Sequence, residues 1–205
     1  MKKILLLMVI LSVFVLSLPA ADFLLGPKIG LGDYNYYGYD WNSYKNYYDI
    51  KNKFTVSFSG GLFFNSRFSD LFSLQIEALY SYRSFRYGDV NWFQENYNAI
   101  TFPIYARFDF DTGKVKPFLM VGPRLGFVFN EFTIKHSSGG TIDAIMLGAN
   151  NFMFGFSLGG GFSFPAGSGK FDAGIVYNNT FTQIFTDWRT YSQGFEIQLG
   201  YGFAL

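Results

Sequence analysis

One thirteen-residue stretch, from Phe152 to Phe164, constrains the fold of this chain more than any other. Every second residue from Phe152 is large and apolar except one glycine, with five phenylalanines and a leucine. The positions between them hold Met153 and five glycines or serines. Because side chains alternate across a β-strand with period two, the pattern predicts a strand with one oily face and one small or polar face.

The small face is predicted to point inward. Eight such strands would bring roughly forty large side chains into one interior, yet an eight-stranded barrel is only just wide enough to be filled by side chains. We therefore expect the apolar rows to contact lipid and the small and polar rows to line a narrow lumen. The predicted fold is all-β, an eight-stranded antiparallel up-and-down transmembrane β-barrel, with strands at 23–32, 53–64, 71–87, 100–110, 116–129, 152–164, 171–178 and 191–205. A soluble lipocalin-like barrel is the rival fold.

The first 21 residues are predicted to be a signal peptide, and residues 22–205 an outer-membrane β-barrel domain. Two lysines follow Met1, an apolar run covers residues 4–18, and Pro19 precedes two alanines. The run is too short to span a bilayer as a helix, and small residues suit a cleavage site after Ala20 or Ala21.

Composition excludes several classes of protein. The chain has no cysteine, so no disulfide framework or cysteine-linked lipid anchor is expected. Removing Lys2 and Lys3 with the leader leaves 14 basic and 15 acidic residues, a net charge of −1. No nucleic-acid partner is implied by that balance.

The predicted connections alternate between long and short. Long loops at 33–52, 88–96, 131–150 and about 179–190 alternate with short turns at 65–70, 111–114 and 165–170. Outer-membrane barrels show this asymmetry, with tight periplasmic turns and longer external loops, and an even strand number puts both termini on the periplasmic side. Pro117 and Pro123 are the main local objection, because each lacks a donor for the strand ladder. The bulky Leu79, Phe118 and Met120 also fall on the inward face.

Three runs resemble the small outer-membrane β-barrel domain family often labelled porin-like. They are Ser-Leu-Gln-Ile-Glu-Ala-Leu-Tyr-Ser at 73–81, Ile-Thr-Phe-Pro-Ile-Tyr-Ala-Arg at 100–107 and Val-Lys-Pro-Phe-Leu-Met-Val-Gly-Pro at 115–123. Thr101 and Phe102 stand where the family pattern has an acid and an isoleucine. The resemblance implies an outer-membrane barrel in the bacterial envelope.

The C-terminal residues 198–205 are similar to the signal read by the barrel-assembly machinery, although such a run is also simply a last alternating strand. The expected partners are therefore outer-membrane lipid and, through the C-terminal strand, the barrel-assembly machinery. An external ligand or host surface is a further candidate partner, of unknown identity.

Charged residues on the small face form the first candidate site. A narrow lumen requires charges of both signs to pair, because an isolated buried charge is costly. The predicted lumen charge network has Glu77, Arg107, Arg124 and Glu196 at its centre, and its expected role is to plug the barrel rather than to conduct ions. Asp109 and Lys116 also face inward, and the full network comprises Lys28, Glu77, Arg83, Arg107, Arg124, Asp172 and Glu196.

The first long loop is the second candidate site. Residues 33–52 hold seven tyrosines, Trp41 and four asparagines, a composition typical of adaptable recognition surfaces. The candidate recognition residues are Tyr37, Tyr39, Trp41 and Tyr44. The favoured interpretation of the loop instead extends the hairpin into the interfacial aromatic girdle, with Tyr34, Tyr36, Tyr47 and Tyr48 as girdle residues.

No catalytic, cofactor or metal site is predicted. Ser157 lies in a Gly-x-Ser-x-Gly pattern, but within an alternating strand, and the chain's one histidine, His136, is expected in a loop. The predicted function is a structural or surface-interaction role in the outer membrane. A narrow porin for small solutes is the alternative, and an outer-membrane enzyme is the second alternative.

Overall fold

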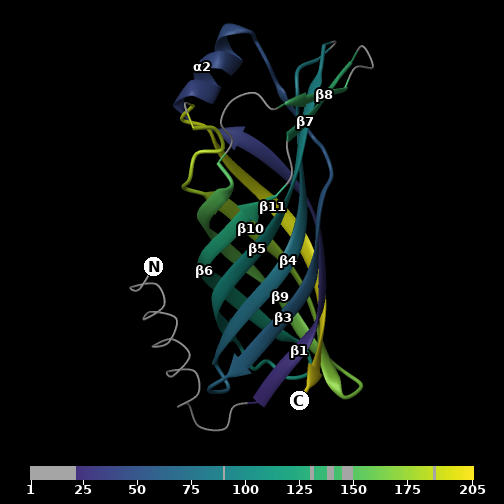
Figure 1. Cartoon of the computed structure of the whole chain (residues 1–205). Coiled ribbons are helices and arrows are strands. Elements are labelled where there is room, and N and C mark those ends of the chain that lie inside the picture. The colour runs from purple at the N-terminus through teal and green to yellow at the C-terminus, as the bar shows by residue number, and fades with distance from the viewer. Residues whose placement is uncertain (1–21, 90, 130–131, 138–140, 145–149, 187) are drawn as a thin grey trace.

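The structure, a computed structural model, describes residues 22–89, 91–129, 132–137, 141–144, 150–186 and 188–205. The predicted signal peptide therefore lies outside the described residues. Eight long strands form a closed ring in which each pairs antiparallel with its neighbours, and the first strand pairs with the last (Figure 1). They are β1 (Asp22–Tyr37), β3 (Ser57–Arg67), β4 (Phe72–Tyr87), β5 (Phe93–Asp109), β6 (Lys116–Val128), β9 (Phe152–Ala166), β10 (Gly169–Thr180) and β11 (Tyr191–Ala204).

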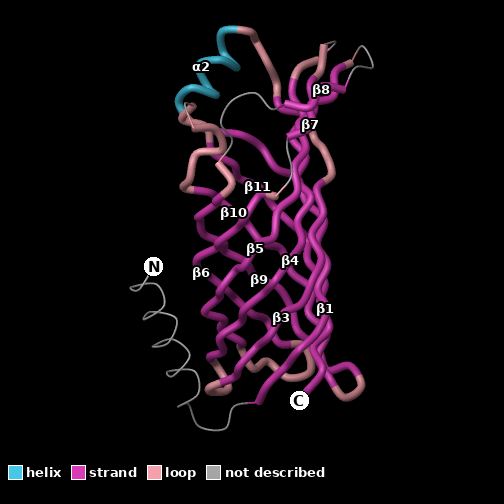
Figure 2. The backbone as a smooth tube through the Cα atoms, viewed as in Figure 1, coloured by secondary structure: helices cyan, strands magenta, loops and turns pink. Residues whose placement is uncertain are grey.

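The smaller elements gather at one end of this barrel. Helix α2 (Tyr39–Tyr47) and the hairpin of β7 (Phe132–His136) and β8 (Thr141–Ala144) lie at the end opposite the C-terminus, and the two-residue strand β2 (Asn52–Lys53) pairs with β4 (Figure 2). Short turns join the strands at the other end, where Leu205 donates its backbone N–H to the carbonyl of Phe23. The first, third and fourth long connections lie at the predicted end, whereas the second is only the stretch 88–92 between β4 and β5.

The exposed fractions of the side chains show which way the alternating rows face. On β11, Phe195 and Ile197 are 60% and 61% exposed, whereas Glu196 between them is 2% exposed. Leu79, Phe118 and Met120 are buried in the lumen, as their register requires. The apolar rows therefore face outward and the small and polar rows face inward.

Two belts of aromatic side chains surround the outward face. One belt lies near the short turns, where Phe72 contacts Phe108 and Phe164 stacks on Phe171. The other lies toward the long loops and includes the pairs Phe58–Tyr82, Tyr80–Phe129, Phe127–Phe152 and Tyr177–Phe195. Aromatic belts of this kind mark the two interfaces of a lipid-facing band. In the part of the chain that the structure describes, no helix is long and apolar enough to cross a membrane.

Several strands extend further than predicted. Strand β1 continues to Tyr37, so Tyr34 and Tyr36 keep the inward register and are buried, and their predicted place in the aromatic girdle is wrong. Strand β5 begins at Phe93, inside the stretch predicted to be the loop 88–96. The loop 131–150 contains β7 and β8, which places the backbone of His136 in a strand.

The prolines are accommodated within the strands. Pro117 and Pro123 both lie in β6, as the alternation predicts. Pairing between β5 and β6 is interrupted between the partners Pro103–Arg124 and Ala106–Val121. Pro123 lies in the part of β6 where this pairing is interrupted. The N–H that proline lacks therefore coincides with a break in the hydrogen-bond ladder.

Gly38 turns the chain from β1 into α2. Its φ angle is 123°, a conformation that favours glycine. A side chain there would also meet the carbonyl oxygen of Arg189, which would lie 2.1 Å from an added Cβ. The tight approach allows the helix to lie against the last long loop, with Trp41 turned toward the barrel.

Candidate functional site

Arg107 organises the charges nearest the short turns. Its guanidinium donates to Asp109 at 2.9 Å and to Asp172 at 2.5 Å, and further to Gln75 at 2.9 Å and Ser163 at 2.6 Å. These partners come from four strands, β4, β5, β9 and β10. Arg107 also lies over the ring of Phe118, 3.9 Å from its centre. A buried guanidinium with two carboxylates and two further acceptors ties opposite walls of the barrel together.

A second ion pair joins Lys28 of β1 to Glu77 of β4. Gln75 donates to the same Glu77 carboxylate at 2.6 Å, and the ammonium of Lys28 lies 5.3 Å from the centre of the Phe63 ring. Both charged side chains are at most 5% exposed, so the pair crosses the lumen without bulk water.

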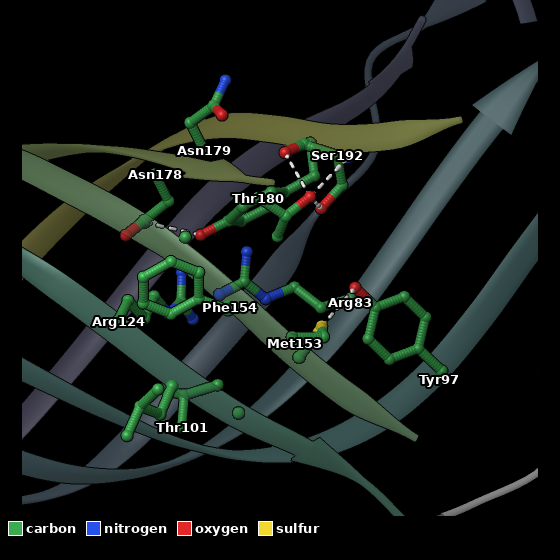
Figure 3. A pocket seen from close by; sticks show the side chains of 14 residues that line it. Arg83, Tyr97, Thr101, Arg124, Met153, Phe154, Asn178, Asn179, Thr180 and Ser192 are labelled. Carbon is green, nitrogen blue, oxygen red and sulfur yellow. Dashed lines mark hydrogen bonds between the residues drawn. The ribbon is translucent and has the colours of Figure 1, made fainter. Parts of the chain in front are cut away.

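Glu196 is the carboxylate of the next layer toward the long loops. It accepts hydrogen bonds from the Tyr34 hydroxyl at 2.5 Å, from Ser59 at 3.1 Å and from Gln198 at 2.9 Å. Arg83 lies 3.4 Å from Glu196 and is stacked 3.5 Å from the centre of the Tyr34 ring. Arg124 projects into the same region of the lumen (Figure 3).

An aromatic cap closes the lumen beyond this layer. Tyr36 stacks on Phe85 with ring centres 4.0 Å apart, and Trp41 of α2 packs edge-on against Tyr36 and Tyr87. Glu95 is buried within the cap and accepts hydrogen bonds from the hydroxyls of Tyr36 at 2.8 Å and Tyr87 at 2.5 Å. The lumen is thus closed at its outer end by rings, and the hydroxyls of Tyr36 and Tyr87 are satisfied internally, while the indole Nε1 of Trp41 has no hydrogen-bond partner among the described residues.

The cavities left in the lumen are very small. One, lined in part by Arg83 and Arg124, has a free volume of about 10 Å³, and another beside Lys28 and Asp172 has about 10 Å³. Each holds about one water molecule. A wider hollow of about 290 Å³ opens at the short-turn end and is lined in part by Asn65, Asp109 and Ser163. Between that mouth and the cap, the side chains of the described residues fill the lumen.

The outer surface carries a broad open groove of about 570 Å³ between α2 and the last long loop. Asp40 of α2 accepts hydrogen bonds from the backbone of Arg189 at 2.7 Å and from its guanidinium at 3.0 Å. These hydrogen bonds hold the pKa of Asp40 below its usual value. The groove is lined by Asp40, Ser43, Tyr44, Gln183, Thr186, Trp188 and Arg189.

The seven predicted lumen charges are all buried inside the barrel, and they form two groups rather than one central network. Glu77 with Lys28 and Arg107 with Asp172 are connected through Gln75, which donates to Glu77 and accepts from Arg107. Glu196 pairs with Arg83 in the other group. Across the described lumen, Arg124 takes part in no ion pair or hydrogen bond. Lys116 pairs instead with Asp111 at the short turn, with N and O atoms 3.2 Å apart.

The candidate recognition residues separate into two groups. Tyr39 is exposed and Tyr44 lines the outer groove, where its ring lies 5.7 Å from that of Trp188. Trp41 is only 5% exposed and belongs to the cap, so it is not a surface residue as predicted. Tyr37 belongs to the barrel wall, where its hydroxyl donates a hydrogen bond to the side chain of Asn179 at 2.9 Å.

The sequence did not predict the second wall of the groove. This wall comes from the last loop and includes Gln183, Trp188 and Arg189. In the sequence, only the length of that loop set it apart. Their proximity to α2 depends on the pairing of β1 with β11, which brings the first and last loops side by side.

The described residues show no constellation for catalysis. Ser157 is buried in the lumen and donates to Asn178 at 2.6 Å, within an unbroken strand. A strand-to-helix turn, which an activated serine of this pattern requires, does not occur there. No cluster of three or more histidine, cysteine, aspartate or glutamate residues suited to a metal ion occurs among the residues described.

Comparisons with known proteins agree with this architecture. Residues 5–203 match the family model of the outer membrane protein beta-barrel domain. The outer membrane protein OprG from Pseudomonas aeruginosa is similar in structure, with 12% identity and a TM-score of 0.54 over 91% of this chain and 97% of that one. Neisserial surface protein A shares 17% identity with a TM-score of 0.48, covering 89% of this chain and 97% of its own. The search of curated proteins gave no match.

Proposed function

Because the chain belongs to the outer membrane protein beta-barrel domain family and resides in the bacterial outer membrane, we propose that it is a closed barrel that presents a rigid recognition surface outside the cell. Lipid contacts the outward apolar rows, and the lumen serves to stabilise the barrel. Its role is structural and surface-interacting, and it is not enzymatic.

The single observation that carries this proposal is the filled lumen. Free volumes of about 10 Å³ leave no continuous path for a solute, and the aromatic cap lies across the outer end. A porin of this size would need a water-filled opening through its length.

Conductance in planar lipid bilayers tests the closed state. We expect the refolded full-length barrel to give no stepwise channel openings in 1 M salt, while a known porin in the same membrane does. Regular openings of one conductance level would contradict the proposal and restore the alternative of a narrow porin for small solutes.

The outer groove supports the recognition role. Tyr44 and Trp188 supply two ring faces, and Asp40, Gln183 and Arg189 supply planar polar groups beside them. Rings with polar groups at their edge suit a ligand that has both apolar faces and hydroxyl groups, such as an external glycan. The Asp40–Arg189 hydrogen bonds hold the two walls in place before a ligand arrives, which lowers the entropic cost of binding.

Paired variants test the groove as the adhesive element. Cells that display Tyr44→Ser with Trp188→Ser should bind immobilised host glycans at least ten times more weakly than wild type, because both ring faces are removed. Tyr47→Ser is the matched control, since Tyr47 lies on the same helix, is 81% exposed and does not line the groove. Equal loss of binding in the control, or no loss in the double variant, would argue against this groove.

Export and assembly follow from the same location. We infer that residues 1–21 are removed as a signal peptide and that the barrel-assembly machinery reads the strand β11. N-terminal sequencing of protein purified from outer membranes should begin at Ala21 or Asp22. Mature protein that begins at Met1 would remove the signal-peptide proposal.

A further inference from the structure

The buried charges of the described residues are paired except at two places, around Arg83 and Arg124 and at Glu95 of the aromatic cap. Toward the short turns, Arg107 and Lys170 face the carboxylates of Asp109 and Asp172. Lys28 faces Glu77. Glu196 is then the one carboxylate left for two arginines, because Glu95 lies in the aromatic cap with tyrosine hydroxyls as its partners. Arginine stays protonated in proteins, so this layer carries one uncompensated positive charge.

The hydrogen-bond donors of this layer are also unsatisfied. The Arg83 side chain is 3% exposed, and its Nε and Nη2 atoms have no hydrogen-bond partner among the described residues. Its approach to Glu196, at 3.4 Å, is an ion pair without hydrogen-bond geometry. A buried donor without an acceptor, like a buried charge without a counter-charge, is destabilising. The missing counter-charge and the missing hydrogen-bond acceptors therefore occur in the same layer of the lumen, around Arg83.

The two arginines line one small cavity. Figure 3 shows Arg83 and Arg124 extending into it from different strands, with Thr101 and Ser192 nearby. Of the described residues that line the cavity, the charged ones are these two arginines. Its free volume of about 10 Å³ accepts about one water-sized particle and excludes phosphate, sulfate or a carboxylate ligand.

From these observations we propose that the lumen binds one monatomic halide ion, of the chloride class, between Arg83 and Arg124. The ion accepts from the unpartnered guanidinium donors and balances the charge of the layer. A water molecule in the same place would accept hydrogen bonds but leave the excess positive charge in a dry interior. The site is independent of the proposed adhesive groove and of whether the barrel conducts.

Thermal unfolding of the refolded, full-length barrel tests the site in solution. Unfolding is followed by the mobility change on denaturing gels in sodium chloride, sodium bromide or sodium gluconate at equal ionic strength. We expect both halides to raise the unfolding temperature by about 3–6 °C at ten times their Kd, with saturation, relative to gluconate. Equal unfolding temperatures in halide and gluconate would overturn the proposal.

Arg124→Met separates halide binding from a general salt effect. The substitution keeps the volume of the side chain and removes the excess charge, so in gluconate the variant should unfold at a higher temperature than wild type. Added chloride should no longer raise that temperature. Arg67→Met is the matched control, because Arg67 lies at the short-turn mouth, pairs with Asp70 and does not line the cavity, so its variant should keep the full halide response.

A direct structural measurement keeps the proposal testable if the variant does not fold. Crystals of the wild-type barrel grown in bromide should show one anomalous peak within contact distance of both guanidinium groups. A well-ordered map with no such peak would overturn the site, as would a peak that is bound to Arg67 or Lys116 at the mouth alone.

Discussion

At the scale of single residues, the lumen is stabilised by two groups of ion pairs, one in which Gln75 connects Glu77 to Arg107 and one formed by Arg83 with Glu196. Apart from Arg107–Asp109, which lies within β5, these ion pairs link two strands that are not neighbours in the ring, as Lys28 of β1 and Glu77 of β4 do. A buried pair adds little net stability when it is compared with apolar side chains of similar volume, yet removal of one partner is strongly destabilising. The pairs therefore fix which strands face each other across the lumen.

Glu77→Gln tests this interpretation. The variant leaves the Lys28 ammonium buried without a counter-charge, so we expect a loss of about 3–5 kcal/mol in the free energy of unfolding. The double variant Lys28→Met with Glu77→Leu should recover most of that loss. Urea unfolding in lipid vesicles measures both.

Asp70→Asn is the control for this cycle. It breaks an exposed ion pair with Arg67 at a short turn and should leave the urea midpoint unchanged. If the double variant were as unstable as Glu77→Gln, the loss of stability would not come from the unpaired charge of Lys28, and this interpretation would be wrong.

At the scale of elements, the period-two pattern predicted the eight strands but not their outer ends. The alternation that turns Gly30 inward continues through Tyr34 and Tyr36, but the predicted strand ended at residue 32, and tyrosine is also common in the aromatic girdle, so the two side chains were placed on the wrong face. Helix α2 was missed because its nine residues, with one buried side chain, show no apolar stripe. Its position depends on contacts with the last loop, which is distant in sequence.

The contact between α2 and the last loop is predicted to be sensitive to acid. Asp40 has its pKa lowered by the side-chain and backbone hydrogen bonds of Arg189, so it is more acidic in the folded protein. Its contribution is present above the unfolded pKa of about 3.9 and is lost as the pH falls through the lower folded value. An NMR titration of the Arg189 amide should therefore show a midpoint below about 3.9.

Asp40→Asn should abolish that titration and leave the β-barrel intact. Asp89→Asn is the control: the Asp89 pKa is also lowered, by Lys53, but the pair lies on another loop. A titration of the Arg189 amide that persists in Asp40→Asn would show that another acid controls this contact.

At the scale of the whole molecule, the fold and the function both follow from the orientation of the alternating rows. Phenylalanine, leucine and isoleucine cover the outward face between two aromatic belts, and the polar residues that would be costly in lipid are turned into the ring. This orientation was predictable from the sequence because the large side chains exceed the volume of the lumen. The exact ion pairs were not predictable, since alternation gives the face of a residue but not the strand that lies opposite.

Single cysteines test the orientation directly, because the chain has none of its own. Ile197→Cys and Gln198→Cys differ by one position in β11 but point to opposite faces, 61% and 5% exposed. In vesicles, a fluorophore on residue 197 should be quenched strongly by brominated lipid, because its side chain lies in the lipid-facing band. Residue 198 should react with a bulky water-soluble maleimide at least ten times more slowly than an exposed control such as Tyr47→Cys, because the lumen has no room for the reagent. Fast labelling at 198, or no lipid quenching at 197, would mean that the rows are reversed and that the closed-barrel function built on them is wrong.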